Sequence, residues 1–355
     1  MGARVAGSVL AARLGDAGID VTLVDAATFP SPALSTHFFR GIDLVDVLDD
    51  LGVLEEVLQL GPPKLTLEYF YPGTEAPSVD LFERRGRRGF HLSVRREPLD
   101  HLLVRRAQRA GTVTFLQGTR LRSLIRDGQR VAGARLERDG QALEIEARVT
   151  VGADGRLSTV ARETGTVDTC ADPSARAAYY AYVEGFRPPV GDHFDGAELS
   201  LAGDELAYVF PSDAGLTCLA VSANLARFRA MRPRHAEAFW ERFTDHPGLR
   251  DRVRAATPAS QVFGYGPQPL YVRRPALSGV LLIGDAGIHI DPWQGHGMDF
   301  AGRHACFAAD AIADVLHGTD ETAAWTRFHE RRDDHALEDY RYTTEMAKDL
   351  RQLIA

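Results

Sequence analysis

The chain has 355 residues, which is enough for two lobes that each bury a core. Apolar residues make up 45% and charged residues 25%, as in an ordinary globular protein. The net charge of −8 argues against a general nucleic-acid-binding protein, because such proteins are normally basic. Three widely spaced cysteines give no sign of a disulfide framework or a cysteine metal site. Without a leader-like start or an apolar run of the ~18 residues that a membrane span needs, we expect a cytoplasmic protein with no membrane span.

The N-terminal segment predicts a glycine turn that leads into a helix. Gly2 and Gly7 flank the turn, and an apolar helical face follows it up to Gly18. A short β-branched run then ends in Asp25, close to the roughly 20 residues expected between a nucleotide-binding turn and its ribose-binding acid. Turn, helix, strand and acid are typical of a dinucleotide-binding unit, in which the helix N-terminus faces a pyrophosphate. An ordinary glycine turn before a helix is the alternative interpretation.

Two properties of this segment depart from the usual motif. Arg4 occupies the position of the middle glycine, where the backbone normally approaches a phosphate most closely. Only Met1 precedes the turn, whereas a Rossmann unit begins with an apolar strand. We expect that the N-terminus is incomplete and that the first strand lies upstream. The alternative is a chain that has lost this strand, which would bring its nucleotide affinity into doubt.

Two later segments deliver glycine and aspartate at the end of predicted strands. The strand-like run 147–152 leads into a turn that contains Asp154, and a helix opens at Ser158. The buried run 280–283 ends in Gly284 and Asp285. A second group of turn residues then follows in a Pro-x-x-Gly-x-Gly spacing: Pro292, Gly295 and Gly297.

In this order and at these separations, the three glycine-rich segments resemble the FAD-dependent aromatic hydroxylases. These are the p-hydroxybenzoate-hydroxylase-like monooxygenases, with flavin halogenases and geranylgeranyl reductases as relatives. The resemblance covers nearly the whole chain and implies an α/β fold, a Rossmann-like FAD-binding domain without its first strand and with an inserted α+β substrate domain. The implied domains are a discontinuous FAD-binding domain at 1–62, 90–168 and 268–318, a substrate domain at 63–89 and 169–267, and C-terminal helices at 319–355.

The resemblance also implies which residues contact FAD. Asp285 would accept hydrogen bonds from the ribityl hydroxyls, and the loop 292–297 would bring backbone amides to the N1–C2=O edge of the flavin ring. Where the family often has Asn, this chain has Asp299, whose charge would lie near the ring unless it is paired or turned away. The full set of predicted cofactor residues is Gly2, Ala3, Arg4, Gly7, Asp25, Arg40, Arg96, Asp154, Gly284, Asp285, Pro292, Gly295, Gly297 and Met298.

Alternating strand-like runs at 177–183, 205–211 and 216–222 predict an antiparallel sheet that faces a pocket. The predicted aromatic pocket residues are Tyr179, Tyr208, Phe210 and Trp293, for each of which plain core packing is the competing interpretation. The predicted acid–base groups are His289, Asp291 and His296, for which a structural role is the alternative. Their spacing matches no recognised metal site, so we expect no metal.

The resemblance implies a monooxygenase of secondary metabolism. NAD(P)H would visit transiently to reduce the flavin, and O₂ would form a C4a-hydroperoxide that hydroxylates an aromatic or polyketide-like small molecule. The alternatives are an FAD-dependent C=C reductase of the geranylgeranyl-reductase type and a non-redox binding protein or cyclase with the same fold. The basic run 83–88 is typical of a solvated turn; otherwise it could receive an acidic substrate, a carrier protein or the NADPH phosphate.

Overall fold

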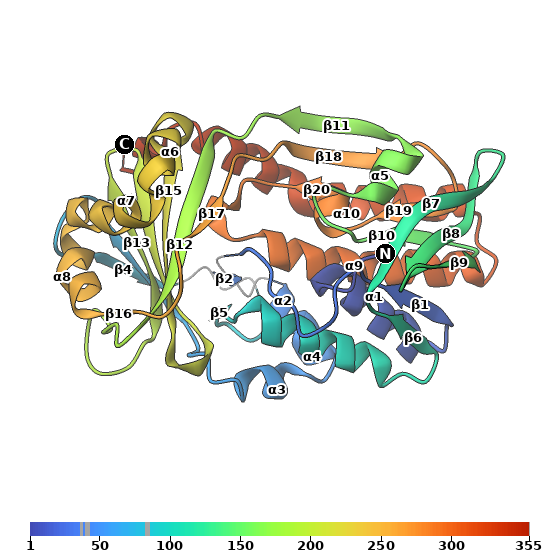
Figure 1. Cartoon of the computed structure of the whole chain (residues 1–355), viewed down its shortest axis with the longest axis horizontal. Coiled ribbons are helices and arrows are strands. Elements are labelled where there is room, and N and C mark those ends of the chain that lie inside the picture. Colours follow the sequence, from blue (N-terminus) through green and yellow to red (C-terminus); the bar gives the residue numbers. More distant parts are fainter. Residues whose placement is uncertain (36–37, 40–42, 82–85, 355) are drawn as a thin grey trace.

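The computed structural model describes residues 1–35, 38–39, 43–81 and 86–354. Figure 1 shows an elongated molecule, with the N-terminus in one lobe and the C-terminus at the far end of the other. The long helices α9 (Gly297–Leu316) and α10 (Glu321–Met346) pack against each other. The predicted α/β class is observed, because helices and strands alternate in one lobe and a broad sheet dominates the other.

The lobe that contains the N-terminus has two pairs of parallel strands. The first pair is β1 (Val21–Val24) with β6 (Val113–Leu116), and the second is β10 (Thr150–Gly152) with β19 (Val280–Leu282). The backbone of Met1 and Gly2 runs between the pairs.

Hydrogen bonds join this short N-terminal stretch to both strand pairs. The Met1 amino group donates to the carbonyl of Val151 at 2.8 Å, and the Gly2 amide donates to that of Val24 at 2.7 Å. These two residues therefore occupy the position at which the Rossmann plan has its first strand.

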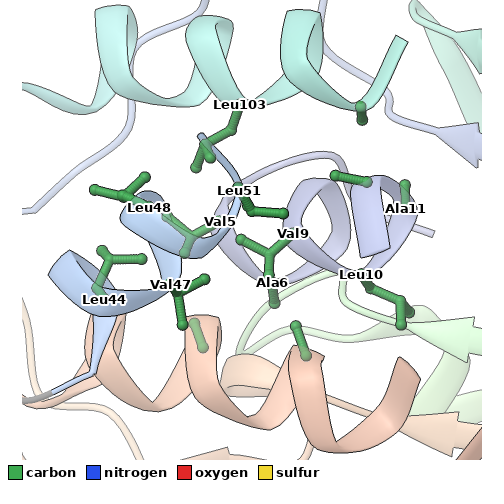
Figure 2. Packing of buried hydrophobic residues seen from close by; sticks show 14 of the residues in the cluster. Val5, Ala6, Val9, Leu10, Ala11, Leu44, Val47, Leu48, Leu51 and Leu103 are labelled. Carbon is green, nitrogen blue, oxygen red and sulfur yellow. The ribbon is translucent and has the colours of Figure 1, made fainter. Parts of the chain in front are cut away.

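Helix α1 (Val5–Asp16) begins directly after the glycine turn and is buried along most of its length. Its apolar side chains, together with those of α2 (Leu44–Asp50), α4 (Arg96–Gln108) and α9, form the core of this lobe, as Figure 2 shows. A Cβ atom on Gly7 would lie 1.8 Å from the Gly2 carbonyl oxygen. Glycine is therefore required for the first turn of this helix to pack against the loop.

The remaining elements of this lobe are short strands and helices. An antiparallel meander is formed by β7 (Thr119–Asp127), β8 (Arg130–Arg138) and β9 (Gln141–Glu146). A second small sheet has the order β11 (Thr166–Asp172), β18 (Leu270–Pro275) and β20 (Ile288–His289). The others are β2 (Phe38–Phe39), which pairs with β5 (Leu92–Ser93), and the helices α3 (Leu54–Leu58) and α5 (Thr159–Thr164).

An eight-stranded sheet dominates the second lobe. Its order is β16–β12–β15–β14–β13–β3–β4, and β17 pairs with β12. The strands are β3 (Leu67–Tyr71), β4 (Ser78–Leu81), β12 (Arg176–Glu184), β13 (Gly196–Ala202), β14 (Glu205–Pro211), β15 (Thr217–Asn224), β16 (Thr257–Pro258) and β17 (Phe263–Tyr265). The three strands that the alternation predicted are present as β12, β14 and β15.

Side chains alternate between the two faces of this sheet. On one face they form a cluster with the helices α6 (Leu225–Met231), α7 (His235–Arg242) and α8 (Pro247–Ala255), which cover the end of the molecule in Figure 1. On the other face, Tyr180, Tyr182, Tyr208 and Phe210 cluster with Phe38 and Trp293, residues outside this sheet. The second face is therefore the one that borders the candidate site. The domain boundaries remain a prediction.

Candidate functional site

A cavity of about 730 Å³ lies where the three glycine-rich segments meet. Most of the predicted cofactor residues line it: Gly2, Arg4, Asp25, Arg96, Asp154, Gly284, Asp285, Pro292, Gly295, Gly297 and Met298. Ala3 and Gly7 do not line it; both are buried and pack within the turn instead. Arg40 lies outside the described residues.

Asp25 braces the first turn from the end of β1. Its carboxylate oxygens accept hydrogen bonds from the amides of Ala3 and Ala27, each at 2.7 Å. Gly2 has a φ of +95°, and a Cβ there would lie 2.2 Å from the carbonyl oxygen of Ala153. The turn and the middle segment therefore approach each other so closely that only glycine fits.

Arg4, the residue in the middle-glycine position, is held by a buried carboxylate. Asp100 on α4 is fully buried, and its Oδ2 accepts from Arg4 Nη1 at 2.8 Å. The same carboxylate pairs with Arg96, whose Nη2 lies 3.0 Å from Oδ2. Both cations consequently lie in the cavity wall with their positions fixed. Sequence reasoning missed Asp100, although its i,i+4 spacing from Arg96 on a helix was a usable signal.

Asp154 caps the helix that follows it. Its carboxylate accepts from Ser158 Oγ at 2.5 Å and from the Thr159 amide at 2.7 Å. Nearby, the guanidinium of Arg156 lies over the ring of Tyr265, 5.2 Å from its centroid. Arg156 Nε is buried and has no hydrogen-bond partner within the described part of the chain. Sequence reasoning did not assign either of these last two residues to the site.

The late segment contributes a carboxylate and the start of a long helix. Asp285 lines the cavity, and its backbone carbonyl accepts from the Tyr271 hydroxyl at 2.7 Å. Among the described residues its carboxylate has no hydrogen-bond partner. Gly295 has a φ of +80°, and helix α9 begins two residues later. The helix N-terminus favours anionic groups in front of it. A cavity of this size suits FAD. Its carboxylates can accept hydrogen bonds from hydroxyl groups. Arg156 Nε and the N-termini of α1 and α9 can face anionic groups.

Asp299 is turned away from this cavity. Its side chain is fully buried, and Oδ1 accepts from the amides of Asp43 at 3.1 Å and Leu44 at 2.8 Å. Asp299 therefore binds the N-terminus of α2, and it is not one of the residues that line the cavity. The sequence left open whether Asp299 is paired or lies near the flavin ring. In the structure its carboxylate is paired with the two amides at the start of α2.

A second cavity, of about 300 Å³, adjoins the first. The two share Phe38, Ala178, Pro292 and Gly295 in their linings. Three of the predicted pocket residues line the smaller cavity: Tyr208, Phe210 and Trp293.

The prediction that Tyr179 lines the pocket differs from the structure. Its ring stacks on Phe228 at 4.5 Å, on the helix-covered face of the sheet. Because successive side chains of β12 point to opposite faces, Ala178 and Tyr180 face the cavities instead.

The three predicted acid–base residues do not line one cavity. His289 lines the larger cavity; its Nδ1 is 2.7 Å from the carbonyl oxygen of Pro269, and its Nε2 is 3.0 Å from the Tyr265 hydroxyl. A carbonyl only accepts, so Nδ1 carries the hydrogen, and Nε2 accepts from the tyrosine. His296 is outside both linings and lies 3.0 Å from Gln294 Oε1.

Asp291 lines the smaller cavity and is only 1% exposed. Its Oδ1 accepts from the Trp293 amide at 3.2 Å, and its Oδ2 has no hydrogen-bond partner among the described residues. Burial raises the pKa of this carboxyl to about 6, although the amide of Trp293 and the charge of Arg176 lower it. Of the three candidates, Asp291 is thus the one with an uncommitted atom beside the aromatic walls.

Three other predictions concern metals, membranes and the basic run. Within residues 1–35, 38–39, 43–81 and 86–354, no cluster of histidine, cysteine and carboxylate side chains is suited to hold a metal. No helix in those ranges has both the length and the apolar character needed to cross a membrane. Arg87 pairs with Asp50 and Arg88 with Asp49, so these members of the basic run bind α2 of the same chain. Residues 83–85 are outside the described ranges.

Comparison with known proteins decides the family. Residues 1–340 match the FAD binding domain family model. The chain belongs to this family. The predicted family and fold class, and the prediction of an FAD-dependent oxidoreductase, are confirmed at this level.

Curated relatives carry different names. Digeranylgeranylglycerophospholipid reductase 1 of Methanopyrus kandleri is 27% identical over 100% of this chain and 89% of its own length. A reductase of the same name from Methanothrix thermoacetophila is 29% identical over 67% of this chain and 58% of its own. Tryptophan 2-halogenase of Chondromyces crocatus is 26% identical over 93% of this chain and 63% of its own.

Solved structures of similar proteins share the fold. The myxobacterial chondrochloren halogenase CndH superposes with a TM-score of 0.84 at 23% identity, covering 96% of this chain and 80% of its own. PqsL, described as a probable FAD-dependent monooxygenase from Pseudomonas aeruginosa, has a TM-score of 0.82 at 23% identity, covering 99% and 95%. PqsL has also been solved in complex with 2-aminobenzoylacetate. At these identities the likeness establishes the fold.

Proposed function

We propose that this chain is an FAD-dependent monooxygenase that hydroxylates an aromatic or polyketide-like small molecule with NAD(P)H and O₂. The observation that carries the proposal is the junction of two cavities of different character. The larger has the size and the charged side chains that suit FAD, and the smaller has aromatic walls. Pro292 and Gly295 lie in the wall that both share.

Bound FAD would supply the redox chemistry, and the side chains of this chain would bind, orient and shield the reactants. Arg4 and Arg96 offer positive charge to the phosphates, and Asp285 offers an acceptor to a hydroxyl group. The aromatic walls of the smaller cavity exclude water from the bound substrate. Excluding water limits side reactions during oxygen transfer. Asp291 is positioned to bind a polar group of that substrate.

A C=C reductase of the geranylgeranyl-reductase type is the second candidate. It is favoured by the curated reductase that aligns with the whole chain at 27% identity. The volume of the smaller cavity argues against a reductase. At about 300 Å³ it is at the low end for ligand pockets and is small for a long isoprenoid chain.

Isotope labelling separates these functions. The FAD-loaded full chain would be supplied with NADH or NADPH, a panel of aromatic substrates and ¹⁸O₂, and the products analysed by mass spectrometry. A hydroxylase gives a product with one labelled oxygen atom. Turnover in the absence of O₂, with no labelled oxygen in the product, would show that the protein is a reductase and not a monooxygenase. Purified protein that shows no visible flavin absorption, even after incubation with FAD, would favour a non-redox binding protein or cyclase.

A further inference from the structure

One polar atom faces the smaller cavity without a hydrogen-bond partner among the described residues. It is Asp291 Oδ2, and its side chain is buried. The buried hydroxyl of Tyr208 lies in the same lining, where Ser222 is its neighbour. Leaving a buried carboxylate oxygen unpaired is unfavourable, so native proteins leave few such atoms, and this one indicates that a ligand completes its hydrogen bonds.

The positive charge in the lining is already committed. Arg176 is buried with its side chain 1% exposed, and its Nη1 donates to Asp204 Oδ1 at 3.0 Å. Its Nε donates to Ser222 Oγ at 3.0 Å, and its Nη2 donates to the carbonyl oxygens of Asp204 and Ser222. This guanidinium thus completes the sheet and has its charge balanced by Asp204. The other ionisable groups in the lining are Glu68 and the two tyrosines, Tyr208 and Tyr342.

Two further polar groups of the walls are also engaged. The indole nitrogen of Trp293 donates to the carbonyl of Thr343 at 3.0 Å, and Gln294 Oε1 lies 3.0 Å from His296 Nε2. Aromatic rings form part of the walls, and those of Phe38 and Phe210 stack with centroids 4.4 Å apart. Such walls favour a planar molecule, which would bury its faces against them.

From this arrangement we infer that the smaller cavity selects a planar molecule with a hydroxyl or amino group, which donates a hydrogen bond to Asp291, and rejects molecules that carry an anionic group. The inference rests on the proposed function and specifies the substrate class of the same site. The Tyr208 hydroxyl is the second polar contact. Because Asp291 directly precedes Pro292 in the wall shared with the larger cavity, the donor-bearing end of the molecule lies next to the flavin-binding cavity.

Three naphthalene probes of similar size test this inference by binding alone. The FAD-loaded, oxidised full chain is titrated at pH 7.5 with 2-naphthol, 2-methoxynaphthalene and 2-naphthoate, following the flavin absorption band. A hydrogen bond to a charged group contributes about 1.5–3 kcal/mol, so 2-naphthol should bind roughly 10- to 100-fold more tightly than the methoxy compound. 2-Naphthoate should bind more weakly than 2-naphthol by at least the same factor.

The variant Asp291→Asn provides the sharpest comparison. Its Oδ1 can still accept from the Trp293 amide, so the amide nitrogen of the new side chain would face the cavity as a donor. The preference for 2-naphthol over 2-naphthoate should therefore fall at least about tenfold. Tyr208→Phe should weaken 2-naphthol binding by a smaller factor. Tyr179→Phe, on the opposite face of the same sheet, is the matched control and should leave the preference unchanged.

Each outcome has a defined meaning. Equal binding of 2-naphthoate and 2-naphthol, no measurable binding of 2-naphthol, or an unchanged preference in Asp291→Asn would overturn the inference. None of these measurements needs NAD(P)H or O₂. If the chain shows the expected preference but incorporates no ¹⁸O, the inference about ligand recognition holds and the proposed monooxygenase function is wrong.

Discussion

The carboxylate of Asp299 accepts a hydrogen bond of 2.8 Å from the amide of Leu44, the first residue of α2. Asp299 lies in the first turn of α9, so this contact ties the start of one helix to the start of another. A carboxylate at a helix N-terminus is stabilised by the helix dipole, and a buried one even more so.

Replacing Asp299 with Ala should lower the free energy of unfolding by about 2–4 kcal/mol, because it leaves two buried amides without an acceptor. Denaturant unfolding measures this loss. Asp320→Ala removes the exposed N-cap of α10 and is the control, with an expected cost of about 1 kcal/mol. Asp299→Asn keeps the acceptor oxygen and should leave the reduction potential of bound FAD unchanged. A large positive shift of the potential would mean that the carboxylate acts on the flavin ring after all.

Asp285→Ala should weaken FAD binding by roughly 1.5–3 kcal/mol, the contribution of a charge-assisted hydrogen bond. The dissociation constant can be measured by quenching of FAD fluorescence on binding to the apoprotein. Asp314→Ala changes an exposed carboxylate paired with Arg327 and should leave FAD affinity unaltered. Equal FAD affinity of Asp285→Ala and the parent chain would mean that the segment 284–285 is only a structural turn.

Asp100 should matter to both stability and cofactor binding, because it holds Arg4 and Arg96 at once. Breaking a buried ion pair typically costs 3–5 kcal/mol, and the partial exposure of both arginines reduces this to about 2–3 kcal/mol for Asp100→Asn. FAD affinity should fall as well. Asp16→Asn breaks the exposed pair with Arg106 and should cost less than about 1 kcal/mol. If both variants lose the same small amount of stability, the buried ion pairs of Asp100 stabilise the fold no more than an exposed pair does.

The raised pKa of Asp291 predicts a pH dependence of stability. Its folded-state pKa of about 6 exceeds the ordinary 3.8, so the folded protein binds this proton more tightly than the unfolded chain does. Ionisation of this group therefore destabilises the fold progressively as pH rises from about 4 to 6, by on the order of 2–3 kcal/mol.

Asp291→Asn removes that penalty while keeping the acceptor for Trp293. The free energy of unfolding of the variant, minus that of the parent chain, should rise between pH 4 and pH 7.5 by this amount and stay level above it. Chemical denaturation of both proteins across this pH range provides the measurement. Parallel stability curves would show that the carboxyl titrates normally.

The sequence by itself determined the cofactor class and the order of the elements. Glycines can be identified from sequence where a turn must pass close to another backbone, and Gly2, Gly284 and Gly295 all have positive φ. The alternating runs of the second lobe predicted β12, β14 and β15, because a half-buried strand places every second side chain on the same face. Such periodicity does not tell which face meets the ligand, and Tyr179 was consequently assigned to the wrong side.

Only the tertiary structure decided which groups are committed and which are available. Asp299, Asp154 and Arg176 are charged residues in glycine-rich or strand segments, and each is held by hydrogen bonds within the chain. Asp100 acts through a contact with Arg4, 96 positions away in the chain. Asp291 Oδ2 has no hydrogen-bond partner among the described residues, and its burial by distant segments raises the pKa of the carboxyl. Burial and pairing depend on segments that meet only after folding, so no local pattern in the sequence could have revealed them.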